Sequence, residues 1–310
     1  MSKNTSVTFE QASGPIDYGF TNDYIFRAIL QNHPKVLTGL VSALLHRPPE
    51  EITSVEVTNP IELGVGYNAK DFILDIKVEI NHCMIMNLEM QVVNRHDWSD
   101  RSLSYLCRSY DQLNRGQEYT DALPVIHIGF LDYTPFPDNV EFYSEYLMIN
   151  RRTGKIYSDK FSLRVVDLTQ IENATEEDKH YRIDYWARLF KAATWEEVQK
   201  MAKENEYIKE ASEALFMLNA DDMAREYSYA REDRMRYERT VNKMLEEQAA
   251  ALAEIETVLE EKRNALAAKD NELAQLDSAL AAKEQALAEQ ATEIARLKKV
   301  VAELQGRSGE

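Results

Sequence analysis

Two short stretches of the sequence carry carboxylates at spacings that favour metal-dependent chemistry. In residues 72–80, and again in residues 84–92, the even positions are all apolar. This period of two predicts two β-strands, each with one apolar face. The odd positions then share the opposite face, and they include Asp75, Lys77, Glu79, Asn87, Glu89 and Gln91.

The loop between the two strands decides which of these residues face each other. If both apolar faces lie on one core, even positions oppose even positions and the loop has an odd number of residues, most simply residues 81–83. With residue 80 opposite residue 84, Asp75 lies directly across from Glu89. Two facing carboxylates repel each other, so this pairing is unfavourable unless a positive charge lies between them.

Two sources of that positive charge are open. A divalent cation such as Mg²⁺ is held by one or two carboxylates, and it activates water for the hydrolysis of phosphodiester bonds. Alternatively, Lys77, with Lys70, neutralises an ordinary solvated face of an antiparallel sheet.

The same residues resemble the active-site signature of the PD-(D/E)XK nuclease superfamily. The pattern Phe72-Ile73-Leu74-Asp75-Ile76, followed by Asn87-Leu88-Glu89-Met90-Gln91, is similar in particular to the PD-(D/E)XK nuclease family transposases, or Rpn recombination-promoting nucleases. In that branch Gln takes the place of the usual Lys. The resemblance covers residues 17–240 and includes the segments 20–27, 101–105, 116–119 and 124–128.

This resemblance implies roles for individual residues. Asp75 and Glu89 would bind Mg²⁺ or Mn²⁺, with the Met90 carbonyl as a further ligand. Gln91 would position the attacking water, although an amide has no charge with which to stabilise an oxyanion. Whether Lys77 or Lys70 supplies the missing charge stays open.

Two further residues are candidates with two interpretations each. Asp23 either approaches the site as a supporting carboxylate or caps a helix predicted over residues 24–31. Arg101, in a helix predicted over residues 98–114, either contacts a phosphate or forms a surface ion pair with Asp97 or Asp100. None of the six histidines has the spacing of a metal ligand, so the sequence assigns them no role.

The final part of the chain repeats an apolar residue every seven positions. A strict period of seven predicts a left-handed coiled coil with a partner helix. The alternative is a single, solvated helix without a partner. The repeating positions lie in a helix predicted over residues 223–305, and they are Leu245, Leu252, Leu259, Leu266, Leu273, Leu280, Leu287, Ile294 and Val301.

Backbone breakers divide the chain into an α/β half and a helical half. All eight prolines lie at or before Pro137, and no glycine occurs between Gly154 and Gly306. This pattern predicts an α/β fold followed by helices. The resemblance implies that residues 15–170 form a restriction-endonuclease-like (PD-(D/E)XK) core, whose sheet contains strands at 72–80, 83–93 and 124–131. A helical extension over 171–222 packs on this core, and the long coiled-coil helix over 223–305 follows.

Composition restricts the class of protein further. The net charge is −17, and residues 1–240 hold 27 basic against 39 acidic side chains, which predicts weak, salt-sensitive binding to DNA. Basic patches remain at residues 151–155 and along residues 225–239. In the second patch, i,i+4 ion pairs with acidic residues of the same helix are the simpler explanation for the basic residues. No apolar run of about 18 residues occurs, so we expect a cytoplasmic protein without membrane association. The two cysteines form no zinc-binding motif.

Two functions from different classes follow. The first is a metal-dependent DNA endonuclease that acts in recombination or on mobile elements. The second is a catalytically degenerate scaffold that keeps the nuclease fold and assembles as a homo-oligomer through its coiled coil.

Overall fold

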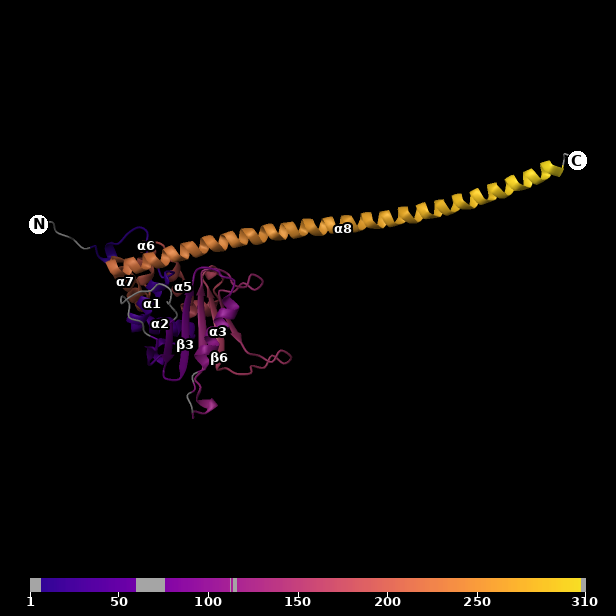
Figure 1. Ribbon diagram of the computed structural model, residues 1–310. Helices are drawn as coiled ribbons and strands as arrows, with labels where there is room; N and C mark the ends of the chain where they lie inside the picture. Colours follow the sequence, from indigo (N-terminus) through magenta and orange to yellow (C-terminus); the bar gives the residue numbers. More distant parts are fainter. Residues whose placement is uncertain (1–6, 60–75, 112, 114–115, 308–310) are drawn as a thin grey trace. The chain divides into compact units, whose positions relative to one another are not determined.

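The structure of the 310-residue chain is a computed structural model that describes residues 7–59, 76–111, 113 and 116–307 (Figure 1). The chain divides into two compact units, residues 1–242 and 243–310. The first unit holds a mixed α/β fold. The predicted boundary at 170–171, between a nuclease-like domain and a helical extension, stays a prediction, because both segments lie in this first unit.

A six-stranded sheet in the order β1-β2-β3-β4-β6-β5 forms the centre of the first unit. Strands β3, β4 and β6 run parallel to one another, while β1, β2 and β5 are antiparallel to their neighbours. The strands are β1 (Val55–Val57), β2 (Ile76–Ile80), β3 (Met84–Gln91), β4 (Val125–Leu131), β5 (Tyr143–Leu147) and β6 (Phe161–Asp167).

The β2–β3 hairpin has the predicted register. Ile80 pairs with Met84 and Ile76 with Leu88, and a three-residue turn over 81–83 joins the strands. The prediction from the period of two is therefore confirmed over the described residues. Asp75 lies outside them, so its predicted pairing with Glu89 stays a prediction.

The second face of β3 is buried, which the sequence did not predict. The alternation of buried and half-buried residues holds along β2, whereas β3 is buried on both faces from Ile85 to Gln91. The reason is its parallel partner β4, which makes β3 an inner strand, and the helix α3 (Trp98–Tyr110), which contacts β3, β4 and β6. The interpretation of this face as an ordinary solvated surface is wrong for β3.

The helices pack on the two faces of the sheet. On the even face of β3, Met86, Leu88 and Met90 join a core with α1 (Asp23–Asn32) and α2 (Pro34–Leu44). On the odd face, Ile85 packs against Leu106 of α3. Helix α3 ends at Tyr110, four residues earlier than predicted.

The segment after the sheet is helical, as predicted. It contains α4 (Glu176–His180), α5 (Ile183–Lys191), α6 (Trp195–Ala202) and α7 (Glu206–Ala220), preceded by a short 3-10 helix at Ile171–Asn173. Trp186, Phe190, Ile208 and Leu215 bury their side chains in the main core. None of the described helices is long and apolar enough to cross a lipid bilayer.

The last helix, α8, runs from Asp222 to Arg307, close to the predicted bounds of 223–305. The two units of the chain meet within it, between Asn242 and Lys243. In the second unit the apolar residues at the seven-residue spacing are exposed, from Leu245 at 57 % to Val301 at 51 %. The coiled coil itself stays a prediction.

Candidate active site

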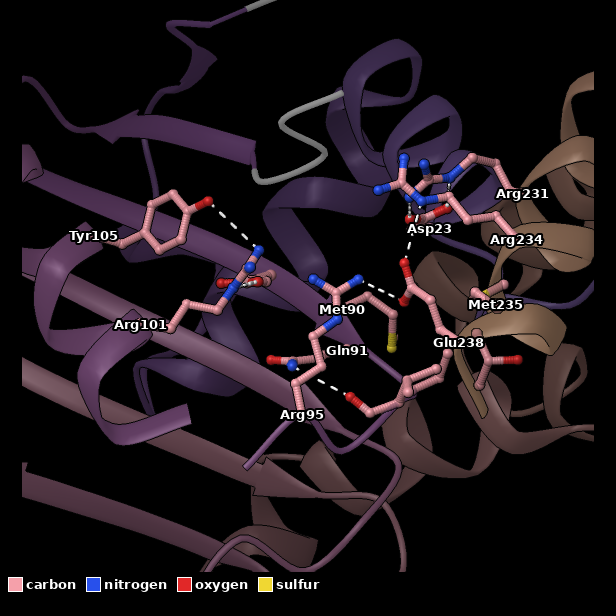
Figure 2. A pocket seen from close by; sticks show the side chains of 14 residues that line it. Asp23, Met90, Gln91, Arg95, Arg101, Tyr105, Arg231, Arg234, Met235 and Glu238 are labelled. Carbon is pink, nitrogen blue, oxygen red and sulfur yellow. Dashed lines mark hydrogen bonds and ion pairs between the residues drawn. The ribbon is translucent and has the colours of Figure 1, made fainter. Parts of the chain in front are cut away.

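A cavity of about 220 Å³ lies at the carboxyl end of β3, within the first unit. It is enclosed by β3 and the residues after it, by α1, by α3 and by the first turns of α8 (Figure 2). Five residues that the sequence singled out line it together: Asp23, Glu89, Met90, Gln91 and Arg101. Lys77, which pairs with Asn87 in the hairpin, is half-buried and is not part of this lining.

Glu89 is a buried carboxylate held by an arginine. Its side chain is 5 % exposed, and its Oε1 accepts a hydrogen bond of 2.8 Å from Nε of Arg101. Burial opposes the charged form of Arg101, yet the attraction of Glu89 and Tyr105 raises its pKa above the usual value. Of the two interpretations of Arg101, the surface ion pair with Asp97 or Asp100 is wrong, because the arginine forms its short ion pair with Glu89; the phosphate contact stays a prediction. Arg101 also lies over the ring of Tyr105, 5.2 Å from the centroid.

His127 of β4 lies fully buried beside Glu89. Its Nε2 is 3.6 Å from Oε2 of Glu89, and its Nδ1 is 2.8 Å from Nδ2 of Asn87. The ring stacks between Trp98 and Tyr105. Since Nδ2 of Asn87 donates, Nδ1 accepts, and the proton of the neutral imidazole then sits on Nε2, facing the carboxylate. The flipped amide would instead direct a lone pair of Nε2 at Glu89, which is less favourable.

The pKa of His127 predicts an effect of acid on folding. Burial first, and Arg101 second, lower this pKa from 6.5 to about 3. The unfolded chain binds this proton below about pH 6.5, so the stability contribution is fully present above that pH and is lost as pH falls towards 3. Between pH 6 and pH 4 we expect the free energy of unfolding to fall more steeply in wild type than in His127→Gln, by roughly 1.4 kcal/mol per pH unit. Urea unfolding at each pH measures this difference. Parallel pH profiles of the two proteins would contradict a buried, neutral His127.

Gln91 places an amide in the cavity next to Glu89. It is 7 % exposed, and its Nε2 donates to the carbonyl of Val93 at 3.3 Å. Its Oε1 is buried and has no hydrogen-bond partner among the residues that the structure describes. A buried carbonyl oxygen in this position is costly unless a ligand or a water fills the cavity.

Asp23 lies in the cavity but does not cap α1. The cap is Asn22, whose side chain accepts hydrogen bonds from the main-chain N–H of Tyr24 and Ile25. Asp23 is the first helical residue, and its carboxylate binds the guanidinium of Arg231 from α8, with 2.8 Å between Oδ1 and Nε. The interpretation of Asp23 as the N-cap is therefore wrong, and the supporting role stays a prediction.

Three arginines that the sequence did not assign to a site complete the wall of the cavity. Arg231 and Arg234 come from α8 and Arg95 from the segment after β3. Glu238 accepts hydrogen bonds from Arg95 at 2.5 Å and from Arg234 at 3.2 Å (Figure 2). The i,i+4 pair of Arg234 with Glu238 was predicted, but the contacts across to Arg95 and Asp23 are not visible in a linear pattern.

The charge of the lining differs from that of the whole chain. Four arginines face three carboxylates around the cavity, in a protein with a net charge of −17. Arginine presents five N–H donors in a planar fork that matches phosphate oxygens. The cavity thus has the composition of a site for an anionic substrate.

The oxygen atoms in the cavity suit a hard divalent cation. Glu89 offers a carboxylate and Gln91 a buried amide oxygen, both of the kind that Mg²⁺ prefers. Over the described part of the chain, no group of three or more His, Cys, Asp or Glu side chains forms a metal site. The other predicted carboxylate, Asp75, lies outside that part. The oxygen donors of Glu89 and Gln91 therefore fit a divalent cation, but they supply only some of the ligands that it needs.

Comparison with known proteins adds the family. No curated protein and no solved structure matches the chain. The family model of the PD-(D/E)XK nuclease family transposases matches residues 20–248, which include the whole sheet, the cavity and the first turns of α8. On this match over most of its length, and with the site just described, the chain belongs to the PD-(D/E)XK nuclease family transposases.

Proposed function

We propose that this protein is a divalent-metal-dependent endonuclease that hydrolyses phosphodiester bonds in DNA. The observation that carries the proposal is the single cavity in which Glu89, Gln91 and four arginines meet at the end of β3. Membership of a nuclease family supports a phosphodiesterase activity. The family description also supports a role in recombination or on mobile elements.

The metal would be held by Glu89, by Asp75 and by the main-chain carbonyl of Met90. When bound, Mg²⁺ or Mn²⁺ would supply Lewis-acid chemistry, which orients the phosphate, lowers the pKa of water and offsets charge on the leaving oxygen. Arg101 fixes the orientation of the Glu89 carboxylate through its 2.8 Å hydrogen bond. The proton on Nε2 of His127 favours the ionised form of this carboxylate from its other side.

Gln91 and Arg101 together would take the two roles of the usual lysine, which are to orient the attacking water and to supply positive charge. Oε1 of Gln91 can accept a hydrogen bond from an attacking water and so orient it, but the amide brings no positive charge. Arg101 lies in the same cavity and carries that charge. Arg95 and Arg234, joined by Glu238, provide guanidinium groups for the phosphates of the substrate.

Metal binding tests the proposal without any need for turnover. We expect calorimetric titration of full-length protein with Mn²⁺ to give binding that weakens at least about tenfold in Glu89→Gln, since even indirect partners of metal ligands contribute that much. Glu79→Gln is the matched control, because Glu79 lies in β2, binds His82 and is not part of the cavity. Equal affinities in all three proteins would contradict the proposed metal site.

The exposed apolar residues of α8 favour self-association as a property of the same protein. A helix of 86 residues that exposes an apolar side chain every seventh position gains stability by pairing. We propose that two copies of this chain associate through residues 245–301. This surface also favours the alternative function, a scaffold without catalysis.

Self-association predicts a specific sensitivity to charge. The double variant Leu273→Lys with Leu280→Lys places two positive charges in the apolar stripe. We expect this variant to be monomeric, as measured by the molar mass from size-exclusion chromatography with light scattering. Asn271→Lys with Ser278→Lys adds the same charge on the opposite side of the helix and is expected to leave the mass unchanged. A monomeric wild type would show instead that α8 is a single, solvated helix.

A further inference from the structure

We infer that residues 148–157, here called the basic arm, form a β-ribbon that binds double-stranded DNA outside the cavity. The inference rests on the proposed function in one respect, namely that DNA is the substrate. The arm connects β5 to β6, on the side of the sheet where long loops project beyond the strands (Figure 1). Its sequence, Met-Ile-Asn-Arg-Arg-Thr-Gly-Lys-Ile-Tyr, contains three cations and no acidic residue.

Hydrogen bonds hold the turn of the arm in one shape. Asn150 is central: its N–H donates to the carbonyl of Lys155 at 2.8 Å, and its carbonyl accepts from Gly154 at 2.8 Å. Its side chain also accepts from the N–H of Arg152 and of Thr153. Gly154 adopts a φ of +70°, which favours glycine. The tip is therefore a built turn, which presents its side chains in a fixed arrangement.

The three cations of the arm have no carboxylate partner, unlike most arginines elsewhere in the described part of the chain. Arg151, Arg152 and Lys155 are all exposed. Among the residues that the structure describes, none of the three forms an ion pair with a carboxylate, whereas Arg164 and Arg188 each bind a glutamate. Three like charges close together repel one another, and a polyanion relieves that repulsion.

Apolar side chains on both faces of the ribbon point to a groove as the binding partner. Ile149 bridges to Ile156, and the N–H of Tyr157 donates to the carbonyl of Met148. These four side chains are between 48 % and 81 % exposed, with Tyr157 the most exposed. A two-stranded ribbon fits the major groove of DNA, where apolar groups contact base edges while cations reach the phosphates.

The arm leaves the sheet at the amino ends of the parallel strands β3, β4 and β6, whereas the cavity lies at the carboxyl end of β3. Glu89 pairs with Gly129, which pairs with Val165 of β6, and the arm begins where Leu147 pairs with Ser162. At about 3.3 Å per residue and about 4.8 Å per strand, the base of the arm at Leu147 is about 17 Å from Glu89. The arm extends from there away from the cavity, and one turn of DNA spans about 34 Å, so a duplex longer than one turn is needed to contact both. The arm then contributes to affinity and not to chemistry.

Salt-dependent binding of a 30-base-pair duplex by the full chain in EDTA tests the arm, because no cleavage occurs there. The test variant combines Arg151→Gln, Arg152→Gln and Lys155→Gln. Each lost phosphate contact reduces the magnitude of the negative slope of log K against log salt by about 0.9. We therefore expect this magnitude to fall by about 2 to 3, with binding at least about tenfold weaker. The control, which neutralises the exposed Lys262, Lys269 and Lys283 of α8, is expected to match wild type.

A single variant separates the apolar contribution from the charges. Tyr157→Ala removes an exposed ring, so it leaves the fold intact, and we expect weaker DNA binding with an unchanged salt slope. The inference is overturned if the triple variant binds DNA as the control does, or if it loses binding to anionic vesicles alone, which would identify a lipid surface. If wild type binds DNA through the arm but cuts none with any metal, the arm stands and the nuclease proposal fails.

Discussion

Replacing Glu89 by Gln is expected to lower the rate of metal-dependent DNA cleavage at least about 100-fold. Removal of one preorganised electrostatic group from an active site has an effect of this size. The substitution keeps the size of the buried side chain but removes the negative charge that pairs with Arg101 and that we propose binds the cation. The rate is measured under single-turnover conditions on a labelled duplex with saturating Mg²⁺ or Mn²⁺, so that weaker DNA binding does not contribute.

The control for this variant is again Glu79→Gln, which should cleave at the wild-type rate. Its carboxylate is about one-third exposed and binds His82 at 2.9 Å, away from the cavity. Far-ultraviolet circular dichroism checks that Glu89→Gln is folded, because the loss of its charge leaves Arg101 partly buried with a neutral partner. If the folded variant retains wild-type cleavage, Glu89 is not a metal ligand and the proposed site is wrong.

Gly129→Ala is expected to destabilise the first unit by about 1 to 3 kcal/mol, the usual cost of overpacking a core. Gly129 pairs with Glu89 in the sheet, and a Cβ at this position would lie 2.0 Å from Cη2 of Trp98. Trp98 is 5 % exposed and stacks on His127, so a shift of Trp98 also disturbs the ring beside Glu89. We therefore expect a Tm lower by several degrees and reduced cleavage in the same variant.

Gly19→Ala is the comparison for this substitution. The atom nearest to its added Cβ is the carbonyl oxygen of Ala192 at 3.7 Å, an ordinary contact. We expect its Tm to stay within about one degree of wild type. An equal Tm for the two alanine variants would show that the packing of Trp98 on Gly129 does not stabilise the sheet beside Glu89.

The elements that follow from local pattern were predictable from the sequence. The β2–β3 register follows from the period of two and a three-residue loop, and the length of α8 follows from the lack of glycine and proline. Both depend on neighbours along the chain. The bounds of α3 were less accurate, because no strong breaker marks its end after Tyr110.

Contacts between residues that lie far apart in the sequence could not be predicted from local patterns. The parallel pairing of β3 with β4 buries the second face of β3 and brings His127 beside Glu89, and no local pattern encodes that register. The contact of Arg231 with Asp23 joins residues 208 positions apart. A histidine within the apolar run Val125–Leu131 was the one available signal, since a buried histidine needs a partner.

The most direct test of the account is the nicking of supercoiled plasmid by the purified full-length protein at low salt. Wild type, Glu89→Gln and Glu79→Gln are each incubated with Mg²⁺, Mn²⁺, Ca²⁺ or EDTA. The account predicts nicking by wild type and by Glu79→Gln with Mg²⁺ or Mn²⁺, none in EDTA, and none by Glu89→Gln under any condition. Plasmid left intact by wild type with every metal, or cut equally by wild type and Glu89→Gln, would contradict it.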